Sequence, residues 1–159
     1  ICREHRDLVS VSSMGRLLRL PVNDSVLPKM GRLAQGPMTM RLLPGEELVG
    51  SLSIDVAETD PTLLLVSRKG QMTRIDLTPL RRCQRGDLGI MAVVLSADED
   101  SVAGLCSGDS LAGIVTDQKR HGRLDAGAVD LTAAGQSWGD QLDLNSKEQV
   151  VSVVALKTS

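Results

Sequence analysis

Two stretches built to the same plan decide the fold: "LVSVSSMGRLLRLPV" at residues 8–22 and "LLLVSRKGQMTRIDL" at residues 63–77. Each reads as an apolar strand, a polar turn ending in glycine, and a second strand with alternating apolar side chains. The matched turn glycines are Gly15 and Gly70, 55 positions apart. Similarity at a fixed spacing is typical of repeat architectures. The sequence therefore predicts a chain built from repeats.

The match continues beyond the two strands. "RLAQG" at 32–36 corresponds to "RGDLG" at 85–89, which begins 53 positions later. Both are followed by a strand-like segment, an acidic turn and a closing apolar segment. In order, the paired segments are "MTMRLL" and "IMAVVL", "PGEE" and "ADED", and "LVGSLSI" and "VAGLCSG".

A third, more divergent copy fills the rest of the chain. "LAGIVTDQKRHGRL" at 111–124 supplies a strand, a basic turn and Gly122, and "AVDL" at 128–131 resembles "RIDL" at 74–77. The acidic turn and closing strand are "SKEQVVSVVAL" at 146–156. The middle keeps glycines at 135 and 139 but has no arginine.

Each repeat is predicted to hold about four short strands, and no segment shows a sustained helical period. Four-stranded repeats of this length are typical of β-propellers, in which each repeat forms one blade. We therefore expect an all-β, propeller-like single domain over residues 1–159. Its three blades, of about 54 residues each, should cover approximately 8–60, 61–110 and 111–159. Closed propellers have at least about four blades, so three should form an open arc or part of a larger ring.

Charge is segregated in phase with the repeats, although the formal net charge is only −2. Residues 1–45 carry seven Lys/Arg against three acids, and residues 61–90 carry six against two, so each block is +4. Residues 46–60 and 91–118 carry five acids each and no base, and residues 119–159 are balanced at five against five. In stacked blades the basic turns would form one positive stripe, which suits duplex DNA. The alternative is a set of ordinary solvated loops.

Several kinds of site are not expected. Cys2, Cys83 and Cys106 lie far apart and form no CxxC pair, so we expect reduced thiols and no metal site. His121 is expected in a solvated loop. No apolar run reaches the roughly 18 residues of a membrane span, and the start "ICREHRDLVSV" lacks a signal-peptide core. The sequence therefore predicts a cytoplasmic protein without a membrane or cofactor partner.

The repeated pattern "LLxVSxxGxxxR…RxxxG" resembles the C-terminal domain found in the A subunits of DNA gyrase and its relative, topoisomerase IV. The resemblance spans most of the chain and is clearest over residues 8–105. It implies a β-pinwheel, a propeller variant in which neighbouring blades exchange a strand, with duplex DNA wrapped on its basic outer edge. It also implies two protein partners, namely the remainder of the topoisomerase's A subunit, together with the ATPase subunit. Which of the two enzymes is the parent stays open.

Residues 83–89, "CQRGDLG", resemble a degenerate form of the family's gyrase A box, Q-(K/R)-R-G-G-(R/K)-G. Arg85, Gly86 and Gly89 match, whereas the opening Gln, the basic residue after it, the second Gly and the last basic residue do not. We expect the glycines to allow a tight turn with backbone N–H groups exposed to a phosphate, which Arg85 would clamp. Asp87 would place a negative charge where DNA should lie. The alternative is an ordinary glycine-rich turn.

Catalysis is not expected of this chain. Type II topoisomerases of this kind cleave DNA with a tyrosine, and the sequence contains none. It also has no GxxxxGK[ST] loop, so no ATPase site of that type. Its single tryptophan, Trp138, offers too little for binding single strands by base stacking and is expected in the core or at a blade interface.

The sequence thus predicts a non-catalytic, nucleoid-associated accessory domain that binds duplex DNA with little sequence preference. The alternative is a protein-interaction propeller whose DNA affinity has decayed. Self-association to complete the ring is a further expectation. The predicted phosphate contacts are Arg16, Arg19, Lys29, Arg32, Arg68, Lys69, Arg74, Arg81, Arg82 and Arg85, extended more weakly by Lys119, Arg120 and Arg123.

Overall fold

The computed structural model describes residues 5–57, 59–95 and 99–156. These residues form strands joined by turns and loops, and their one helical segment is a three-residue 3₁₀ turn, Ala126–Ala128. No helix of the described ranges is long and apolar enough to cross a membrane. The expected all-β class is confirmed.

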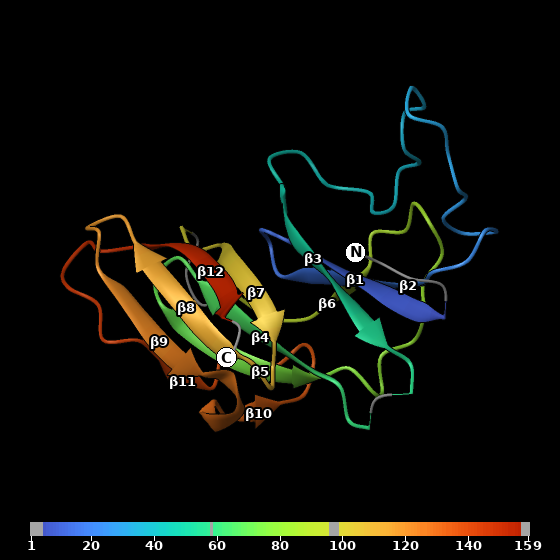
Figure 1. The fold of residues 1–159 in the computed structure, drawn as a ribbon. Helices are drawn as coiled ribbons and strands as arrows, with labels where there is room; N and C mark the ends of the chain where they lie inside the picture. The colour runs from blue at the N-terminus through green and yellow to red at the C-terminus, as the bar shows by residue number, and fades with distance from the viewer. Residues whose placement is uncertain (1–4, 58, 96–98, 157–159) are drawn as a thin grey trace.

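Three sheets follow one another along the chain (Figure 1). The first contains β1 (Arg6–Ser12), β2 (Arg16–Pro21), β3 (Leu48–Asp55) and β6 (Ile90–Met91), in the order β3-β1-β2-β6. The second contains β4 (Thr62–Ser67), β5 (Gln71–Asp76), β7 (Val102–Ser107), β10 (Leu131–Thr132) and β11 (Asp140–Gln141). The third contains β8 (Leu111–Thr116), β9 (His121–Asp125) and β12 (Val150–Leu156).

The three sheets share one internal register. Val11, Val66 and Val115 pair with Gly50, Gly104 and Ser152, respectively. An irregularity in the ladder follows at the same place in each sheet. The central hairpins are antiparallel, and their alternating apolar side chains point to opposite faces.

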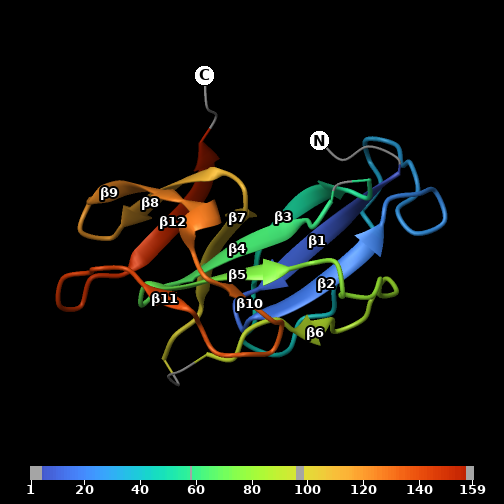
Figure 2. The ribbon, with the colours of Figure 1, turned by 90° about the horizontal axis from the view of Figure 1, so that it is seen from below.

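The sheets stack through their inner strands, β3, β7 and β12, which lie side by side in Figures 1 and 2. Small residues let them approach. A Cβ on Gly50 would lie 2.9 Å from a methyl carbon of Leu105, and one on Gly104 would lie 2.6 Å from the Cβ of Val153. Gly50 of the first sheet and Gly104 of the second thus leave room for an apolar side chain of the next sheet.

The core lies between the sheets. Val9 and Val11 of β1 pack with Leu63 and Leu65 of β4, and all four are fully buried. A second cluster joins the other face of β4 to the third sheet. Trp138 packs partly buried against the first cluster, in agreement with its expected core position.

Strands are exchanged between repeats. The chain that leaves β5 of the second sheet crosses to the first sheet, where β6 pairs with β2. The chain that leaves β9 of the third sheet crosses to the second, where β10 and β11 pair with β5. We call residues 77–94 and 126–141 the crossing segments. The outer edge of each of the first two sheets is therefore covered by the repeat that follows it.

The corresponding segment of the first repeat, residues 22–47, forms an arm that projects beyond the first sheet (Figure 1, blue to cyan). The strand predicted for "MTMRLL" is wrong, because residues 38–43 form no strand. Met40 instead packs with Leu18 and Leu20 on the outer face of the first sheet. A strand-like sequence at an edge forms a strand only where a neighbouring strand is present to pair with it.

Two predicted matches in the third repeat are wrong in register. The turn position held by Gly15 and Gly70, with φ of +79° and +84°, is held by Lys119 at +62°, whereas Gly122 lies within β9. Arg74 corresponds to Arg123 by strand pairing, so "RIDL" matches residues 123–126 rather than 128–131. The sequence does not show that Lys119 corresponds to Gly15 and Gly70, because only its positive φ identifies the same turn position.

Candidate nucleic-acid interface

The hairpin tip of the first repeat is locked by a buried ion pair. Arg16 Nε donates to Glu46 Oε1 at 2.9 Å, and Arg16 Nη2 contacts Glu46 Oε2. Both side chains are buried. The Glu46 carboxylate also accepts from the backbone N–H of Leu43 at 2.7 Å, so it ties the arm to the hairpin.

The hairpin tip of the third repeat also contains an Arg–Glu ion pair. Arg120 Nη1 donates to Glu148 Oε2 at 2.6 Å, and Thr116 Oγ1 donates to Glu148 Oε1 at 2.6 Å. The backbone N–H of Asn145 also donates to Glu148 Oε2, at 2.8 Å. In the second repeat the acid is Asp100, which accepts from the backbone N–H of Lys69 at 3.1 Å. An acid therefore closes each hairpin tip.

These contacts set the acidity of the two glutamates. Burial favours a raised pKa for Glu46, but hydrogen bonds from Arg16, Leu43 and Ser12 outweigh it and hold the pKa below its usual value. The pKa of Glu148 is likewise lowered, chiefly by the hydrogen bond from Thr116. Both carboxylates are therefore ionised at neutral pH and neutralise the arginines beside them.

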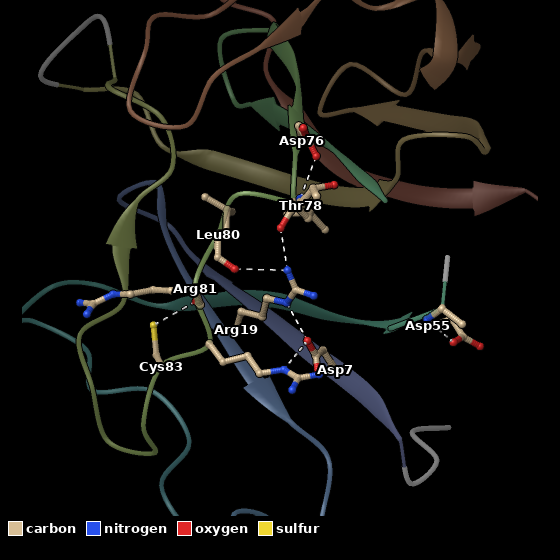
Figure 3. A network of polar contacts seen from close by, with 11 residues as sticks. Asp7, Arg19, Asp55, Asp76, Thr78, Leu80, Arg81 and Cys83 are labelled. Carbon is tan, nitrogen blue, oxygen red and sulfur yellow. Dashed lines mark hydrogen bonds and ion pairs between the residues drawn. The ribbon is translucent and has the colours of Figure 1, made fainter. Parts of the chain in front are cut away.

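A second network fixes the crossing segment to the first sheet (Figure 3). Asp7 is fully buried, and its Oδ2 accepts from Arg19 Nε at 2.6 Å and from Arg82 Nε at 3.1 Å. Arg19 Nη1 also donates to the carbonyl oxygens of Leu77 at 2.6 Å and Leu80 at 3.2 Å. One buried carboxylate and one guanidinium thus connect β1, β2 and the segment arriving from the second sheet.

These networks engage part of the predicted phosphate-binding set. Arg16 is buried on Glu46, and Arg19 is 13% exposed and bonded to Asp7. Arg82 is 51% exposed but is held by the same aspartate. Arg74 is half-buried beneath the second crossing segment, where its Nη1 lies 3.8 Å from the position of a Cβ on Gly127. Arginines at matched positions were expected to form a DNA-binding stripe; in the structure Arg19 donates to the first crossing segment, and Arg74 lies beneath the second.

The box loop, residues 81–89, is also more internally bonded than expected. The N–H of Gly86 donates to the carbonyl of Thr39 at 2.9 Å and is not offered to a phosphate. The Asp87 carboxylate accepts from the backbone N–H of Gln84 at 2.8 Å, so this acid caps the turn. Gly86 and Gly89 have φ of +85° and +78°, which accounts for both glycines.

Residues 22–45 of the arm, which stop before Glu46 and Glu47, form one basic surface with the box loop, and we call residues 22–45 and 81–89 the box–arm surface. Two hydrogen bonds join its two parts: the backbone N–H of Arg41 donates to Asp87 O at 3.0 Å, and the Arg85 side-chain Nη1 donates to Val26 O at 3.3 Å. Six Lys/Arg and two acids give these ranges a net charge of +4. The exposed basic residues are Lys29, Arg32, Arg41, Arg81, Arg82 and Arg85, of which Arg82 is paired with Asp7.

Arg41 is absent from the predicted set because it lies in the mispredicted strand, and its proximity to Asp87 arises only on folding. The structure does not bring the remaining predicted residues to this surface. Arg68, Lys69 and Lys119 are exposed at the hairpin tips, as is Arg120, which is paired with Glu148. Arg123 is exposed on β9. Lys147, also unpredicted, lines a polar hollow with Lys69.

The cysteines and His121 differ in their exposure. Cys106 is buried, and burial followed by the charge of Asp109 raises the pKa of its thiol to about 11. Cys83 is half-buried, and Cys2 lies outside the described residues. His121 is exposed at the start of β9 rather than within a loop. Within the described ranges, no cluster of His, Cys, Asp and Glu is arranged to hold a metal.

Sheets that stack about common inner strands and exchange outer strands define a propeller-type domain of the β-pinwheel kind. The chain belongs to the family of DNA gyrase C-terminal domains, described as a beta-propeller, whose model matches residues 6–55 and 61–105. The expected family is therefore confirmed.

Curated relatives agree with this assignment. The chain is 28% identical over 136 residues to the A subunit of DNA gyrase from Mycolicibacterium smegmatis, a match that covers 86% of the chain and 15% of that protein. It is 33% identical over 89 residues to the corresponding gyrase protein of Pseudomonas aeruginosa, covering 56% of the chain and 9% of that protein. The chain thus spans a small part of each relative.

Two solved structures show the same fold. The C-terminal domain of DNA topoisomerase IV matches with a TM-score of 0.83 and 20% identity, over 96% of this chain and 47% of that one. A DNA gyrase A C-terminal domain matches with a TM-score of 0.79 and 24% identity, over 94% and 50%. The chain therefore spans about half the length of these domains.

Proposed function

We propose that this domain binds duplex DNA through its phosphates, without catalysis, as a cytoplasmic accessory domain in the A subunit of a type II topoisomerase. The observation that carries the proposal is the box–arm surface, where exposed basic side chains from two distant segments gather with a net charge of +4. Family membership supports the same function.

The chemistry of this surface suits backbone contacts. Guanidinium groups bind phosphates in a bidentate manner and stay charged at any physiological pH. Duplex DNA presents a charge every ~1.7 Å, and its counterions are released when such groups neutralise it. Aromatic stacking platforms are scarce, since the chain has one tryptophan and no phenylalanine or tyrosine. The surface therefore favours duplex over single-stranded DNA and has little means of reading sequence.

The arm also supports a second candidate function, docking of a protein partner. It exposes apolar side chains beside the basic ones, and Leu33 is fully exposed. The others are Met30, Met38, Leu42 and Leu43. Apolar side chains gathered in this way are typical of protein-interaction surfaces. In this alternative the basic residues would orient a partner, such as another part of the topoisomerase.

Salt-titrated binding distinguishes the two functions. Random duplexes of about 40 and about 150 base pairs would be titrated at low and moderate salt. DNA binding predicts a steep loss of affinity with salt, tighter binding to the longer duplex, and bending detected by end-to-end energy transfer. No binding even at low salt would contradict the DNA proposal and favour protein docking.

A further inference from the structure

The box–arm surface is basic apart from two acids, and one of them, Asp87, lies within the box loop itself. Its side chain is exposed, and it occupies the position where the box pattern has a second glycine. An exposed carboxylate at this place repels the phosphates of a duplex. The contacts of Asp87 nevertheless have a second effect, of the opposite sign.

Residues 84–87 form a turn that Asp87 closes through both its backbone and its side chain. Its backbone N–H donates to the carbonyl oxygen of Gln84 at 3.2 Å, and its carboxylate accepts from the backbone N–H of Gln84 at 2.8 Å. Gly86 has a φ of +85°, which the third residue of a type II turn requires. Two reciprocal hydrogen bonds therefore fix the turn, and an alanine at position 87 could make only one of them.

Arg85 occupies the second position of this turn. The turn therefore sets the direction of its Cα–Cβ bond and the space that its guanidinium can reach. The side chain is exposed, and of its five N–H donors one, on Nη1, is bonded within the described ranges, to the carbonyl oxygen of Val26. The other donors are available to a phosphate, which guanidinium groups bind in a bidentate manner.

The other half of the loop is held by backbone contacts that do not involve the Asp87 side chain. The N–H of Gly86 donates to the carbonyl of Thr39 at 2.9 Å, and the N–H of Arg41 donates to the carbonyl of Asp87 at 3.0 Å. A different side chain at position 87 leaves both bonds possible. The contribution of the carboxylate is therefore confined to the half of the turn that carries Arg85.

We propose that Asp87 is a positioning residue of the DNA-binding surface: by closing the turn it fixes Arg85, and this gain in duplex affinity exceeds the loss caused by its charge. The inference rests on the proposed function. A binding group that is already ordered loses less conformational freedom when it meets its ligand. The repulsion is the weaker effect, because a Debye length of about 8 Å at physiological ionic strength confines it to the nearest phosphates.

Three single variants separate the charge of Asp87 from its hydrogen bond. Asp87→Ala removes both, whereas Asp87→Asn removes the charge and keeps a side-chain oxygen that can accept from Gln84. Asp24→Ala is the matched control, because Asp24 is the other acid of the box–arm surface and lies two positions from Val26. Its side chain is exposed and makes no hydrogen bond or ion pair with a described residue.

The affinity of each variant for a random duplex of about 150 base pairs is measured at several salt concentrations, and circular dichroism melting verifies the fold. We expect Asp24→Ala and Asp87→Asn to bind at least as tightly as the parent chain, because each loses a repulsive charge and leaves the turn closed. Asp87→Ala should bind more weakly, and its slope of log affinity against log salt should be lower by about 0.9, the value of one phosphate contact.

A second pair of variants tests whether Asp87 acts through Arg85. Adding Asp87→Ala to Arg85→Ala should not weaken binding further, since no guanidinium is left to position. The two changes are therefore expected to be non-additive, as is usual for residues that act together. A purely structural role of Asp87 would weaken binding equally in both backgrounds.

An Asp87→Ala variant that binds as tightly as Asp24→Ala would overturn the inference, because the acid would then act by its charge alone. An Asp87→Asn variant that binds as weakly as Asp87→Ala, or an additive loss with Arg85→Ala, would contradict it as well. A parent chain that does not bind the duplex at low salt would overturn the proposed function together with this inference. The binding of the parent chain thus distinguishes the two failures.

Discussion

Arg16 and Glu46 lie 30 positions apart, yet their buried side chains meet through two contacts at the tip of the first hairpin. An ion pair recurs at the equivalent place two repeats later, where the half-exposed Arg120 contacts the buried Glu148. An arginine expected to bind phosphate instead closes a turn.

Arg16→Ala should destabilise the domain strongly. It would leave the Glu46 carboxylate buried without its counter-charge, which costs about 3–5 kcal/mol. Replacing both partners, as Arg16→Met with Glu46→Leu, should cost clearly less, because no charge is then stranded. Urea denaturation of the two variants measures both effects. Equal losses from the single and double changes would contradict this account.

Stability should depend on the acidity of the two tip glutamates. Their native pKa values lie below the 4.5 of a free glutamate, so their stabilisation is complete above about pH 4.5 and is lost as pH falls through the lower native value. Glu46→Gln and Glu148→Gln should be less stable than the parent at pH 7, with the difference narrowing towards pH 3. Denaturation at both pH values tests this, and a difference independent of pH would count against it.

Asp7→Asn should loosen the first crossing segment. The neutral amide cannot balance Arg19 and Arg82, and breaking a buried pair costs about 3–5 kcal/mol. We expect faster amide hydrogen exchange in residues 80–91 before exchange rises in β4 and β5. Asp55→Asn serves as control, because Asp55 is exposed. Uniform acceleration throughout the domain would show that the network does not act on this segment in particular.

Gly104→Val tests the stacking of the second sheet on the third. The new Cβ would lie 2.6 Å from the Cβ of Val153, and overpacking of this kind costs about 1–3 kcal/mol. Gly45→Asn is a useful contrast, since Gly45 has open space around it and asparagine tolerates its φ of +78°. Thermal melting should drop for Gly104→Val and change little for Gly45→Asn. The reverse order would refute the stacking role of Gly104.

Much of the fold follows from the sequence because alternation and turn glycines act locally. The hairpins at 8–22 and 63–77 need only adjacent residues to form. The strand predicted at 38–43 failed because its formation depends on an edge supplied by a different repeat. The turn at Lys119 escaped notice because a lysine can adopt a left-handed backbone that the sequence pattern assigns to glycine.

The site was less predictable than the fold. Sequence shows that Arg19 and Arg74 recur in phase, but not that each lies beneath the next repeat's crossing segment. Positive charge near a repeat turn is consistent with binding a phosphate and with binding a buried carboxylate. Only the positions of Asp7 and Glu46 in the folded chain show that Arg19 and Arg16 pair with buried carboxylates. The basic residues that stay exposed on the box–arm surface come from loops, where no periodicity marks them.

The sharpest test of DNA binding uses Arg81 and Arg85. Both are exposed on the box loop, and the Arg81 side chain points away from the Asp7 network (Figure 3). Arg82 is left intact because its ion pair with Asp7 would confuse binding with folding.

Arg81→Ala with Arg85→Ala should weaken duplex binding and lower the slope of log affinity against log salt by about 1.8, at about 0.9 per phosphate contact. The free energy of unfolding should stay within about 0.5 kcal/mol of the parent, as for other surface changes. Lys147→Ala, an exposed cation outside the box–arm surface, is the control and should leave the slope unchanged. If the double variant keeps the parent's salt slope and Lys147→Ala lowers that slope, the DNA lies over the hairpin tips and not over the box–arm surface.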